Sequence, residues 1–496
     1  MILGKLCLET MRLEDITKLI QPILVRGPLS QDIEGIAYDS RQVRKNYLFV
    51  AVKGERVNGE DFIDDAIKRG AVAVVSEQDA WPKRSVAHIH VENARLALAE
   101  IASAYYGHPA ERLEMFGITG TNGKTTTSFM IRAILETAGR HSGLIGTVRY
   151  EIGERVIPAG RTTPEAPDIQ FMLDAMIKSG CESAVMEVSS HALDQKRVWG
   201  VPFDVGIFTN LSRDHLDYHG TMENYYNTKC QLFRSLGQLG KSATAVINID
   251  DAWGMRLAIT NGLSAEVLTY GEHPGADVQA TDVELGPEGS RFRLVSRWGE
   301  YPMAVSMPGR HNVSNALAAI AATAVRGIPL PVIAEALRAM EQVPGRLQRF
   351  QGRNGVQVYV DYAHSDDALS RVLQTVREFT RGKLTVVFGC GGNRDASKRP
   401  LMGAAASQMA DHVIITNDNP RQEDPLTIIR QIESGIRAGA SYEVQPDREF
   451  AIAAAIARAR PGDAVIIAGK GHENYQEFAH AVTPFDDGQV VRKYLL

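Results

Sequence analysis

One short stretch of the sequence combines a lysine, several hydroxyl side chains and two glycines in an order that suits phosphate chemistry. Residues 120–126 read Gly-Thr-Asn-Gly-Lys-Thr-Thr. The glycines let successive backbone N–H groups point into one concavity, and a helix that begins after them adds partial positive charge. Lys124 can place a full positive charge on the terminal phosphates of a nucleotide, and Thr125 can offer its hydroxyl to a magnesium ion. The stretch therefore predicts a nucleotide-binding loop.

The elements expected on either side of this loop are those that a phosphate-binding loop requires. Residues 113–119 are predicted to form a short buried strand, and residues 124–138 a helix. The match to the general pattern is incomplete, because Ile118 occupies the position of its first glycine. A glycine turn that merely joins a strand to a helix is the alternative. The Gly-Lys-Thr sequence between the two elements favours nucleotide binding.

A carboxylate follows the loop at the end of another predicted strand. Glu187 lies in the apolar run of residues 183–188 and is followed by two serines and a histidine. In a mostly parallel sheet the carboxyl ends of the strands meet at one edge, so Glu187 could bind magnesium beside Thr125. A solvated carboxylate at the end of a strand is the alternative. The expected proximity to Thr125 favours the metal role.

The sequence leaves the roles of three basic residues, His215, His219 and Lys229, undecided. His215 and His219 are four residues apart, so a helix would carry both on one face. Leu216 stands where a zinc motif usually has glutamate, and we therefore exclude zinc. One of the histidines as a magnesium ligand or nucleotide neighbour stays open. Lys229 lies on a predicted helix, and taken alone a helical lysine is most often a solvated surface residue.

Three polar loops follow predicted strands in the last third of the chain. They comprise residues 391–395, 418–421 and 469–473. Because these strands should end at the same edge of a sheet, the loops are expected to form one pocket. Guanidinium groups pair with carboxylates and carboxylates pair with ammonium groups, so the pocket suits a zwitterionic ligand. Its candidate residues are Arg394, Asp418, Arg421 and Glu473.

Composition narrows the class of protein. The chain has 496 residues, 44% hydrophobic and 23% charged, with a formal net charge of −5. Such a small net charge predicts no general attraction to nucleic acid or to membranes. The four cysteines, Cys7, Cys181, Cys230 and Cys390, are scattered, which fits free thiols in a reducing compartment. Without a secretory signal or an apolar run that could span a membrane, we expect a cytoplasmic protein.

The order of predicted elements indicates an α/β protein of three domains. Residues 1–110 are expected to form a small N-terminal α/β domain. Residues 111–343 are expected to form a central P-loop-type domain around a mostly parallel sheet, with antiparallel strands at 276–305. Residues 344–496 are expected to form a C-terminal Rossmann-like domain after the Val-Pro-Gly boundary at 343–345.

Four segments resemble the Mur ligases, the ATP-dependent amino-acid-adding enzymes of bacterial cell-wall precursor synthesis. They are the loop at 120–126, Met-Glu-Val-Ser-Ser-His-Ala-Leu at 186–193, Thr-Asn-Leu-Ser-Arg-Asp-His-Leu-Asp-Tyr-His at 209–219, and Asp-Tyr-Ala-His at 361–364. The resemblance covers nearly the whole chain. In addition, Asp-Asn-Pro-Arg at 418–421 is similar to the motif of members that add meso-2,6-diaminopimelate rather than L-lysine. A bidentate arginine is a natural discriminator, because lysine lacks the second carboxylate of diaminopimelate.

The resemblance implies roles for the nucleotide and metal residues. Thr125 and Glu187 would hold one Mg²⁺, and His215 would hold a second, bridged by Lys229 after its carbamylation by carbon dioxide. Lys124, Lys229 and His215 would be the catalytic residues. ATP would be bound by the phosphate loop and the start of the helix that follows it, by one further residue of the central domain, and by two residues of the third domain. These are Gly120, Thr121, Asn122, Gly123, Lys124, Thr125 and Thr126, then Asn312, and then Arg346 and Asp361.

The resemblance also implies the substrates and the reaction. The D-glutamate γ-carboxylate of UDP-N-acetylmuramoyl-L-alanyl-D-glutamate would attack ATP to give an acyl phosphate, which the amine of diaminopimelate would then displace. Closure of the third domain would assemble the site, and the enzyme is expected to be a monomer. The UDP-linked substrate would be bound by Ser40, Thr162, Thr163, Ser189, Gln195 and Arg197. Diaminopimelate would be bound by Arg394, Asp418, Asn419, Pro420, Arg421, Gly469 and Glu473.

Some positions depart from the family pattern, and other functions stay open. Asn393 replaces a usual aspartate, Gln348 replaces a common acidic residue, and Ser365 with Asp366 replaces Thr-Pro. None of these positions carries a predicted ligand, although Asn393 adjoins the amino-acid pocket. The alternatives are a lysine-adding or folylpolyglutamate-synthase-like ligase of the same architecture, and a nucleotide-dependent switch without bond-forming chemistry.

Overall fold

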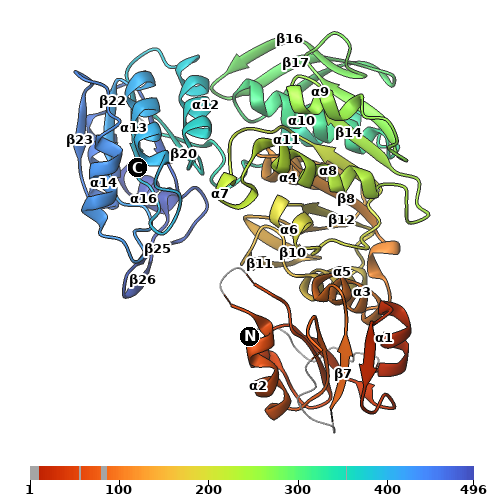
Figure 1. The fold of residues 1–496 in the computed structure, drawn as a ribbon. Coiled ribbons are helices and arrows are strands. Elements are labelled where there is room, and N and C mark those ends of the chain that lie inside the picture. Colours follow the sequence, from red (N-terminus) through yellow and green to blue (C-terminus); the bar gives the residue numbers. More distant parts are fainter. Residues whose placement is uncertain (1–9, 55–56, 80–85, 353–354, 496) are drawn as a thin grey trace.

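The computed structural model describes residues 10–54, 57–79, 86–352 and 355–495, and the chain builds three large sheets in succession (Figure 1). We refer to the parts around them as the N-terminal, central and C-terminal units. Cys181, Cys230 and Cys390 are buried and free, whereas Cys7 lies outside the described residues. Within the described ranges, no helix has both the length and the apolar character needed to cross a membrane.

The N-terminal unit contains a five-stranded sheet. In spatial order its strands are β2 (Leu24–Arg26), β7 (Ala87–His90), β6 (Ala71–Ser76), β5 (Tyr47–Val50) and β4 (Gly35–Ala37). β2 is antiparallel to β7, and the other neighbours are parallel. The helices are α1 (Leu13–Ile20), α2 (Ile63–Lys68) and α3 (Ala94–Tyr105), and two short strands, β1 (Met11–Arg12) and β3 (Asp32–Ile33), pair separately. Alternate residues of the strands pack against α1 and α3 on one face and against α2 on the other.

The central unit contains an eleven-stranded mixed sheet. In spatial order its strands are β11 (Arg155–Pro158), β10 (Arg149–Ile152), β9 (Ser142–Ile145), β12 (Ser183–Glu187), β8 (Glu114–Thr119), β13 (Val205–Phe208), β14 (Thr244–Asn248), β15 (Glu266–Gly271), β16 (Val278–Gly286), β17 (Gly289–Ser296) and β18 (Gly299–Val305). The strands from β9 to β16 pair in parallel, and two strands at each edge are antiparallel. The predicted mostly parallel sheet, with antiparallel strands within 276–305, is confirmed.

Helices cover both faces of this sheet because its strands are apolar on both sides. Phe116 and Ile118 of β8 face one core, and Met115 faces the other. The first face carries α4 (Lys124–Thr137), α10 (Arg310–Ala324) and α11 (Leu330–Ala339). The second carries α5 (Ala166–Lys178), α6 (Ser190–Asp194), α8 (Met222–Ser235) and α9 (Ala252–Ala258), and the short helix α7 (Leu216–His219) precedes α8.

The C-terminal unit is a three-layer α/β structure. In spatial order its strands are β19 (Gln348–Gln351), β20 (Gln357–Asp361), β24 (Ala464–Ala468), β21 (Leu384–Phe388), β22 (His412–Ile415) and β23 (Tyr442–Val444), all parallel except β19. One face carries α12 (Asp366–Arg377), α13 (Lys398–Met409) and α14 (Pro425–Glu433), and the other carries α15 (Arg448–Arg458) and α16 (Asp487–Leu495). A hairpin of β25 (Tyr475–Phe478) and β26 (Ala481–Pro484) projects from this unit (Figure 1). The predicted α/β class is confirmed; the domain boundaries at 110 and 343 stay predictions.

A buried ion pair fixes the strand ends of the C-terminal unit. Arg448 donates to both carboxylate oxygens of Asp487, each at 2.7 Å, and both side chains are fully buried. The same guanidinium donates to the carbonyl of Ala468 at 3.0 Å and to that of Asn417 at 3.4 Å. These carbonyls end β24 and follow β22, so one arginine links the starts of two predicted pocket loops.

We expect Arg448→Ala to lower the free energy of local unfolding in this sheet by about 3–5 kcal/mol, because it leaves Asp487 charged and buried. Hydrogen exchange of the β24 amides in the full chain measures this quantity. Arg458→Ala is the matched control, since Arg458 forms an exposed pair with Glu443 at 2.7 Å and should cost about 0–1 kcal/mol. Equal protection of β24 in both variants would contradict the argument.

Candidate active site

The loop after β8 has the shape that its glycines require. Gly120 has a φ of 149° and Gly123 a φ of 89°. A Cβ atom on Gly120 would lie 1.9 Å from Thr209 Oγ1, and one on Gly123 would lie 2.3 Å from Asn315 Oδ1. Side chains at either position would therefore collide with the neighbouring segments. The loop leads directly into α4, whose first residue is Lys124, so the predicted strand, turn and helix are confirmed.

Lys124 curls back over the loop from which it projects. Its ammonium donates to the carbonyls of Gly120 and Thr121, each at 2.8 Å. Burial lowers the pKa of this ammonium, because desolvation disfavours the charged form. The side chain is thus a desolvated cation at the N-terminal end of a helix, a position that attracts phosphate.

Glu187 lies at the centre of a hydrogen-bonded cluster at the end of β12. Its carboxylate is fully buried. It accepts from the Thr125 hydroxyl at 3.0 Å, and from the backbone N–H and the hydroxyl of Thr147, each at 2.8 Å. Arg346 of the C-terminal unit donates to Thr125 Oγ1 at 3.1 Å. The expected proximity of Glu187 and Thr125 is confirmed, whereas their metal role stays a prediction.

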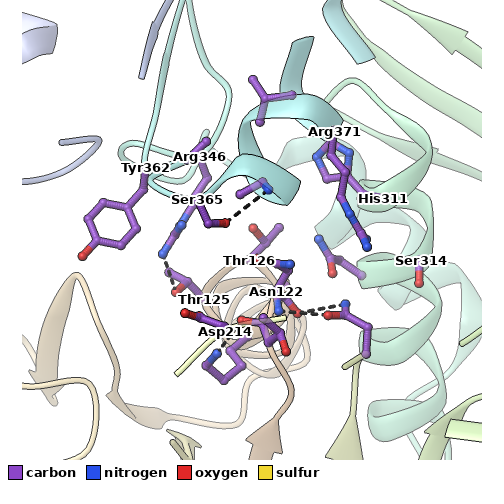
Figure 2. Close-up of a pocket in the computed structure, with 18 of the residues that line it drawn as sticks. Asn122, Thr125, Thr126, Asp214, His311, Ser314, Arg346, Tyr362, Ser365 and Arg371 are labelled. Atoms are coloured by element: carbon purple, nitrogen blue, oxygen red, sulfur yellow. Dashed lines mark hydrogen bonds between the residues drawn. The ribbon is translucent and has the colours of Figure 1, made fainter. Parts of the chain in front are cut away.

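A cavity of about 510 Å³ opens above this cluster, between the central and C-terminal units (Figure 2). Figure 2 shows Arg346 reaching down to Thr125 from one side and His311 and Arg371 lining the other. Apart from Gly120, every residue predicted to bind the nucleotide lines it: Thr121, Asn122, Gly123, Lys124, Thr125, Thr126, Asn312, Arg346 and Asp361. Burial raises the pKa of Asp361, which accepts from the backbone N–H groups of Leu347 and Ala363.

Other residues of this cavity are not among those predicted from the sequence. They include Thr147, Asp250, Asp251, His311, Asn315 and Arg371. Asp250 and Asp251 follow β14 after one intervening residue, so the rule that ligands bind beyond the strand ends could have identified them. Arg371 lies on α12 of the C-terminal unit, and it reaches the cavity only because the two units lie against each other.

Lys229 is not a surface residue. It is 1% exposed, and its Nζ atom donates to the carbonyl of Gly120 at 2.9 Å. Its ammonium also lies 4.5 Å from the ring centroid of Tyr225. Desolvation, together with repulsion from Lys124, lowers the pKa of Lys229 well below its ordinary value. The reading of Lys229 as a solvated helical lysine is therefore wrong: α8 turns it toward the phosphate loop.

His215 and His219 do not share a helix face, because α7 begins after His215. His215 has a left-handed backbone, with a φ of 52°, and lines the cavity. Burial lowers its pKa to about 4, so its imidazole is neutral near pH 7. His219 is not among the residues that line the cavity, and its ring lies 2.9 Å from the Ser190 hydroxyl. Among the described residues, no three His, Cys, Asp or Glu side chains are grouped as metal ligands.

The residues predicted to bind the UDP-linked substrate lie, with one exception, next to Glu187. Thr163 donates to the Glu187 carbonyl at 2.7 Å, and the Thr162 hydroxyl is 3.0 Å from that of Thr147. Arg197 donates to the Thr163 carbonyl at 2.9 Å and to Gln195 at 2.6 Å. The backbone N–H of Ser189 donates to Thr163 at 3.0 Å. Ser40 lies apart from them, in a turn of the N-terminal unit that Asp39 caps.

Glu165 is a further residue of this cluster that sequence analysis missed. Its carboxylate pairs with Arg161 at 2.6 Å and with Arg197 at 3.1 Å. It also pairs at 3.4 Å with Arg95, which lies on α3 of the N-terminal unit. Glu165 therefore ties a predicted substrate arginine to the neighbouring unit. It follows Thr162 and Thr163 closely in sequence, but nothing in the sequence marks its three arginine partners.

The three polar loops of the C-terminal unit meet, as predicted. Asn419 donates to Glu473 at 2.8 Å, and Arg421 donates to the Gly392 carbonyl at 2.8 Å. A Cβ atom on Gly469 would lie 2.6 Å from Asp418 Oδ2, so Gly469 and Asp418 are also adjacent. The carbonyl of Pro420 lies against Gly392. Arg394, by contrast, is exposed. The proximity of these loops is confirmed, while their ligand stays a prediction.

Three protein-family models match the chain, each in one part of it. The Mur ligase family catalytic domain matches residues 32–106, the Mur ligase middle domain matches 118–323, and the Mur ligase glutamate ligase domain matches 345–471. Two curated relatives, from Clostridium tetani and Geobacter metallireducens, are each 43% identical. They cover 98% and 97% of this chain and 99% and 98% of their own length, and both are named UDP-N-acetylmuramoyl-L-alanyl-D-glutamate–2,6-diaminopimelate ligase.

A solved structure of the same name has 35% sequence identity and a TM-score of 0.70, and the match covers 98% of this chain and 99% of that one. Full-length similarity at this level, together with the three successive domain matches, agrees with the resemblance found in the motifs. The chain belongs to the Mur ligase family.

Proposed function

We propose that this protein is an ATP-dependent ligase that joins meso-2,6-diaminopimelate to UDP-N-acetylmuramoyl-L-alanyl-D-glutamate. The observation that carries the proposal is the cluster around Glu187. Its carboxylate bonds Thr125 of the phosphate loop, and its carbonyl bonds Thr163 of the predicted acceptor site. One residue thus joins the segment that would hold the transferred phosphoryl group to the segment that would hold the attacking carboxylate. The names of the 43% identical relatives support the same substrates.

The first step would be phosphoryl transfer to the D-glutamate γ-carboxylate. A carboxylate oxygen forms a bond to the γ-phosphorus of ATP, and the bond to the β-phosphate oxygen breaks to release ADP. Such a transition state spreads charge over the equatorial phosphate oxygens, and fixed cations stabilise it. Lys124 and Arg346 would supply these cations, since both line the cavity beside Thr125. The desolvation of Lys124 strengthens its attraction to phosphate.

The residues beside the phosphate loop fit magnesium. Thr125, Glu187 and His215 offer a hydroxyl, a carboxylate and a neutral imidazole toward one cavity. Mg²⁺ in phosphoryl-transfer sites commonly takes one or two protein carboxylates and completes its shell with phosphate and water, so a larger acidic cage is not required. Magnesium bound there would neutralise phosphate charge during transfer.

Lys229 would act as its carbamate. A neutral amine is the form that attacks carbon dioxide, and burial favours that form of Lys229. The nitrogen forms a bond to the carbon of carbon dioxide, one C=O π pair moves onto oxygen, and the nitrogen releases one proton to solvent, so that the neutral amine becomes an anionic carbamate. That anion would lie close to Lys124, whose charge acts on Lys229. The change places an anion beside the Lys124 cation and provides a further carboxylate beside His215.

The second step would be attack by the amine of diaminopimelate. The amine forms a C–N bond to the acyl carbon, phosphate leaves with the electrons of the C–O bond, and a proton is released. One contact of the C-terminal unit would bring the amino-acid loops toward the acyl phosphate: Arg346 donates a hydrogen bond to the hydroxyl of Thr125. Arg421 would bind the second carboxylate of diaminopimelate, and Glu473 an ammonium group.

We expect phosphate release from ATP only when the UDP-linked dipeptide, magnesium and meso-diaminopimelate are all present. The measurement compares phosphate release and tripeptide formation with diaminopimelate, with L-lysine and without an amine. Activity with lysine in place of diaminopimelate would support the ligase reaction but contradict the proposed preference for diaminopimelate. Equal ATP hydrolysis in all three would favour a nucleotide-dependent switch.

We expect Lys229→Ala to lose at least about two orders of magnitude in kcat, because it removes the proposed carbamate. Added short carboxylates such as formate or acetate should restore part of the activity by occupying the vacated space. Lys178→Ala is the control, since Lys178 is 45% exposed and pairs with Asp174. An active Lys229→Ala variant without added carboxylate would remove the carbamate proposal.

We expect Arg421→Ala to raise the KM for diaminopimelate by about tenfold to a hundredfold, because a charged carboxylate loses its partner. The KM for ATP should change less than about twofold, since the two pockets have separate residues. Steady-state kinetics with each substrate varied in turn measures both constants, with Arg458→Ala as the control. Equal losses for the two substrates would show that Arg421 is misassigned.

A further inference from the structure

Strand β25 is attached to the segment that carries Arg421. The backbone N–H of Arg421 donates to the carbonyl of Glu477 at 2.9 Å. The side chain of Gln476 donates to the Asp418 carbonyl at 3.1 Å, and the N–H of Glu477 donates to Asn419 Oδ1 at 3.0 Å. The strand therefore holds both the backbone and the side chains of residues 418–421.

Arg421 has a backbone conformation that its surroundings must maintain. Its φ is 53°, in the left-handed region that non-glycine residues rarely adopt. Asn393 on the facing loop also has a φ of 53°, and its Oδ1 accepts from the N–H of Gln422 at 3.0 Å. Asparagine tolerates this conformation better than most residues. Asn393, which replaces the usual aspartate of the family, can therefore still help to hold the backbone at Arg421 in place.

The guanidinium of Arg421 is held on one side and open on the other. Its Nε donates to Glu477 Oε2 at 3.0 Å, and its Nη1 donates to the Gly392 carbonyl at 2.8 Å. Among the residues that the structure describes, Nη2 has no hydrogen-bond acceptor within bonding distance. The edge formed by Nη1 and Nη2 is the one that binds a carboxylate end-on through two parallel bonds.

The negatively charged group of the pocket, the Glu473 carboxylate, is also held in place by hydrogen bonds. Lys470 is fully buried, and its ammonium donates to Glu473 at 3.0 Å and to Asn419 Oδ1 at 3.1 Å. Asn419 Oδ1 therefore accepts from Lys470 and from the N–H of Glu477 at once. The two ion pairs, Lys470 with Glu473 and Arg421 with Glu477, share this amide as a common anchor.

We propose that Glu477 is a positioning residue that orients Arg421 for an amino acid with a second carboxylate, and so sets the selectivity of the ligase. Glu477 accepts from Nε and the Gly392 carbonyl accepts from one hydrogen of Nη1, which leaves Nη2 and the second hydrogen of Nη1 to the ligand. Without it, the bond from Nη1 to the Gly392 carbonyl is the hydrogen bond that remains to the Arg421 side chain among the described residues. This side chain is 20% exposed and can then take other rotamers more easily. This inference rests on the proposed ligase function and adds a residue that the motif at 418–421 does not contain.

The test compares Glu477→Ala and Glu477→Gln in the full-length enzyme. We expect Glu477→Ala to raise the KM for diaminopimelate about tenfold, with kcat and the KM for ATP nearly unchanged, because binding depends on one oriented guanidinium. The preference for diaminopimelate over lysine should fall by the same factor. Glu477→Gln should recover most of the loss, since an amide oxygen accepts the same bond from Nε.

Glu443→Ala is the matched control, because Glu443 also pairs with an arginine of the C-terminal unit, Arg458 at 2.7 Å, but on the far edge strand β23. It should leave all constants unchanged. An unchanged or lower KM for diaminopimelate in Glu477→Ala would overturn the inference, the lower value showing that Glu477 competes with the ligand. If the unmodified enzyme ignores diaminopimelate, the proposed function fails instead, so the two failures are distinguishable.

Discussion

The structure depends on the burial of the Glu187 carboxylate. A carboxylate removed from water is strongly destabilising unless hydrogen bonds compensate for the lost hydration. Thr125 and Thr147 provide three such bonds, so the phosphate loop and the β9–β10 connection must lie where they do. Thr163 is fixed to the carbonyl of the same residue. The positions of nucleotide loop and acceptor loop are thus set by the requirement to satisfy one anion.

The same site confines two lysines in a small, poorly hydrated volume. Lys124 and Lys229 both donate to the carbonyl of Gly120. Desolvation lowers the pKa of both ammonium groups, and the charge of Lys124 lowers the pKa of Lys229 further. The arrangement therefore favours a charged Lys124 beside a Lys229 that is either neutral or converted to an anion. Helix α8 is therefore part of the phosphate site, although its sequence resembles an ordinary amphipathic helix.

The sequence predicted what depends on local pattern. The phosphate loop, the apolar strands and the loops after the C-terminal strands follow from glycine placement and from hydrophobic runs, and the structure confirms where they meet. The burial of Lys229 could not be predicted from its own helix, because that depends on how α8 packs against β8. The left-handed backbone of His215 was missed for a related reason: a spacing of four residues implies a helix only if the helix begins early enough.

Residues that act through partners distant in sequence were missed altogether. Glu165 has three arginine partners, one of them 70 residues away in another unit. Lys470 and Glu477 pair with loops that precede them by more than 50 positions. Neither hydrophobic periodicity nor a short sequence motif predicts pairs between residues so far apart in the chain. The resemblance to a family supplied ligand-contacting residues but not the residues that hold them.

The buried pair of Arg448 and Asp487 affects the order in which the parts of the chain fold during synthesis. Arg448 lies beneath the starts of two pocket loops, yet its counter-ion comes 39 residues later. During synthesis, the C-terminal sheet cannot neutralise this arginine until residue 487 has left the ribosome. The strands of the central sheet end at Val305 and the last helix that covers it ends at Ala339, so this unit does not wait for residue 487. The nascent chain should therefore acquire its phosphate loop well before its amino-acid pocket.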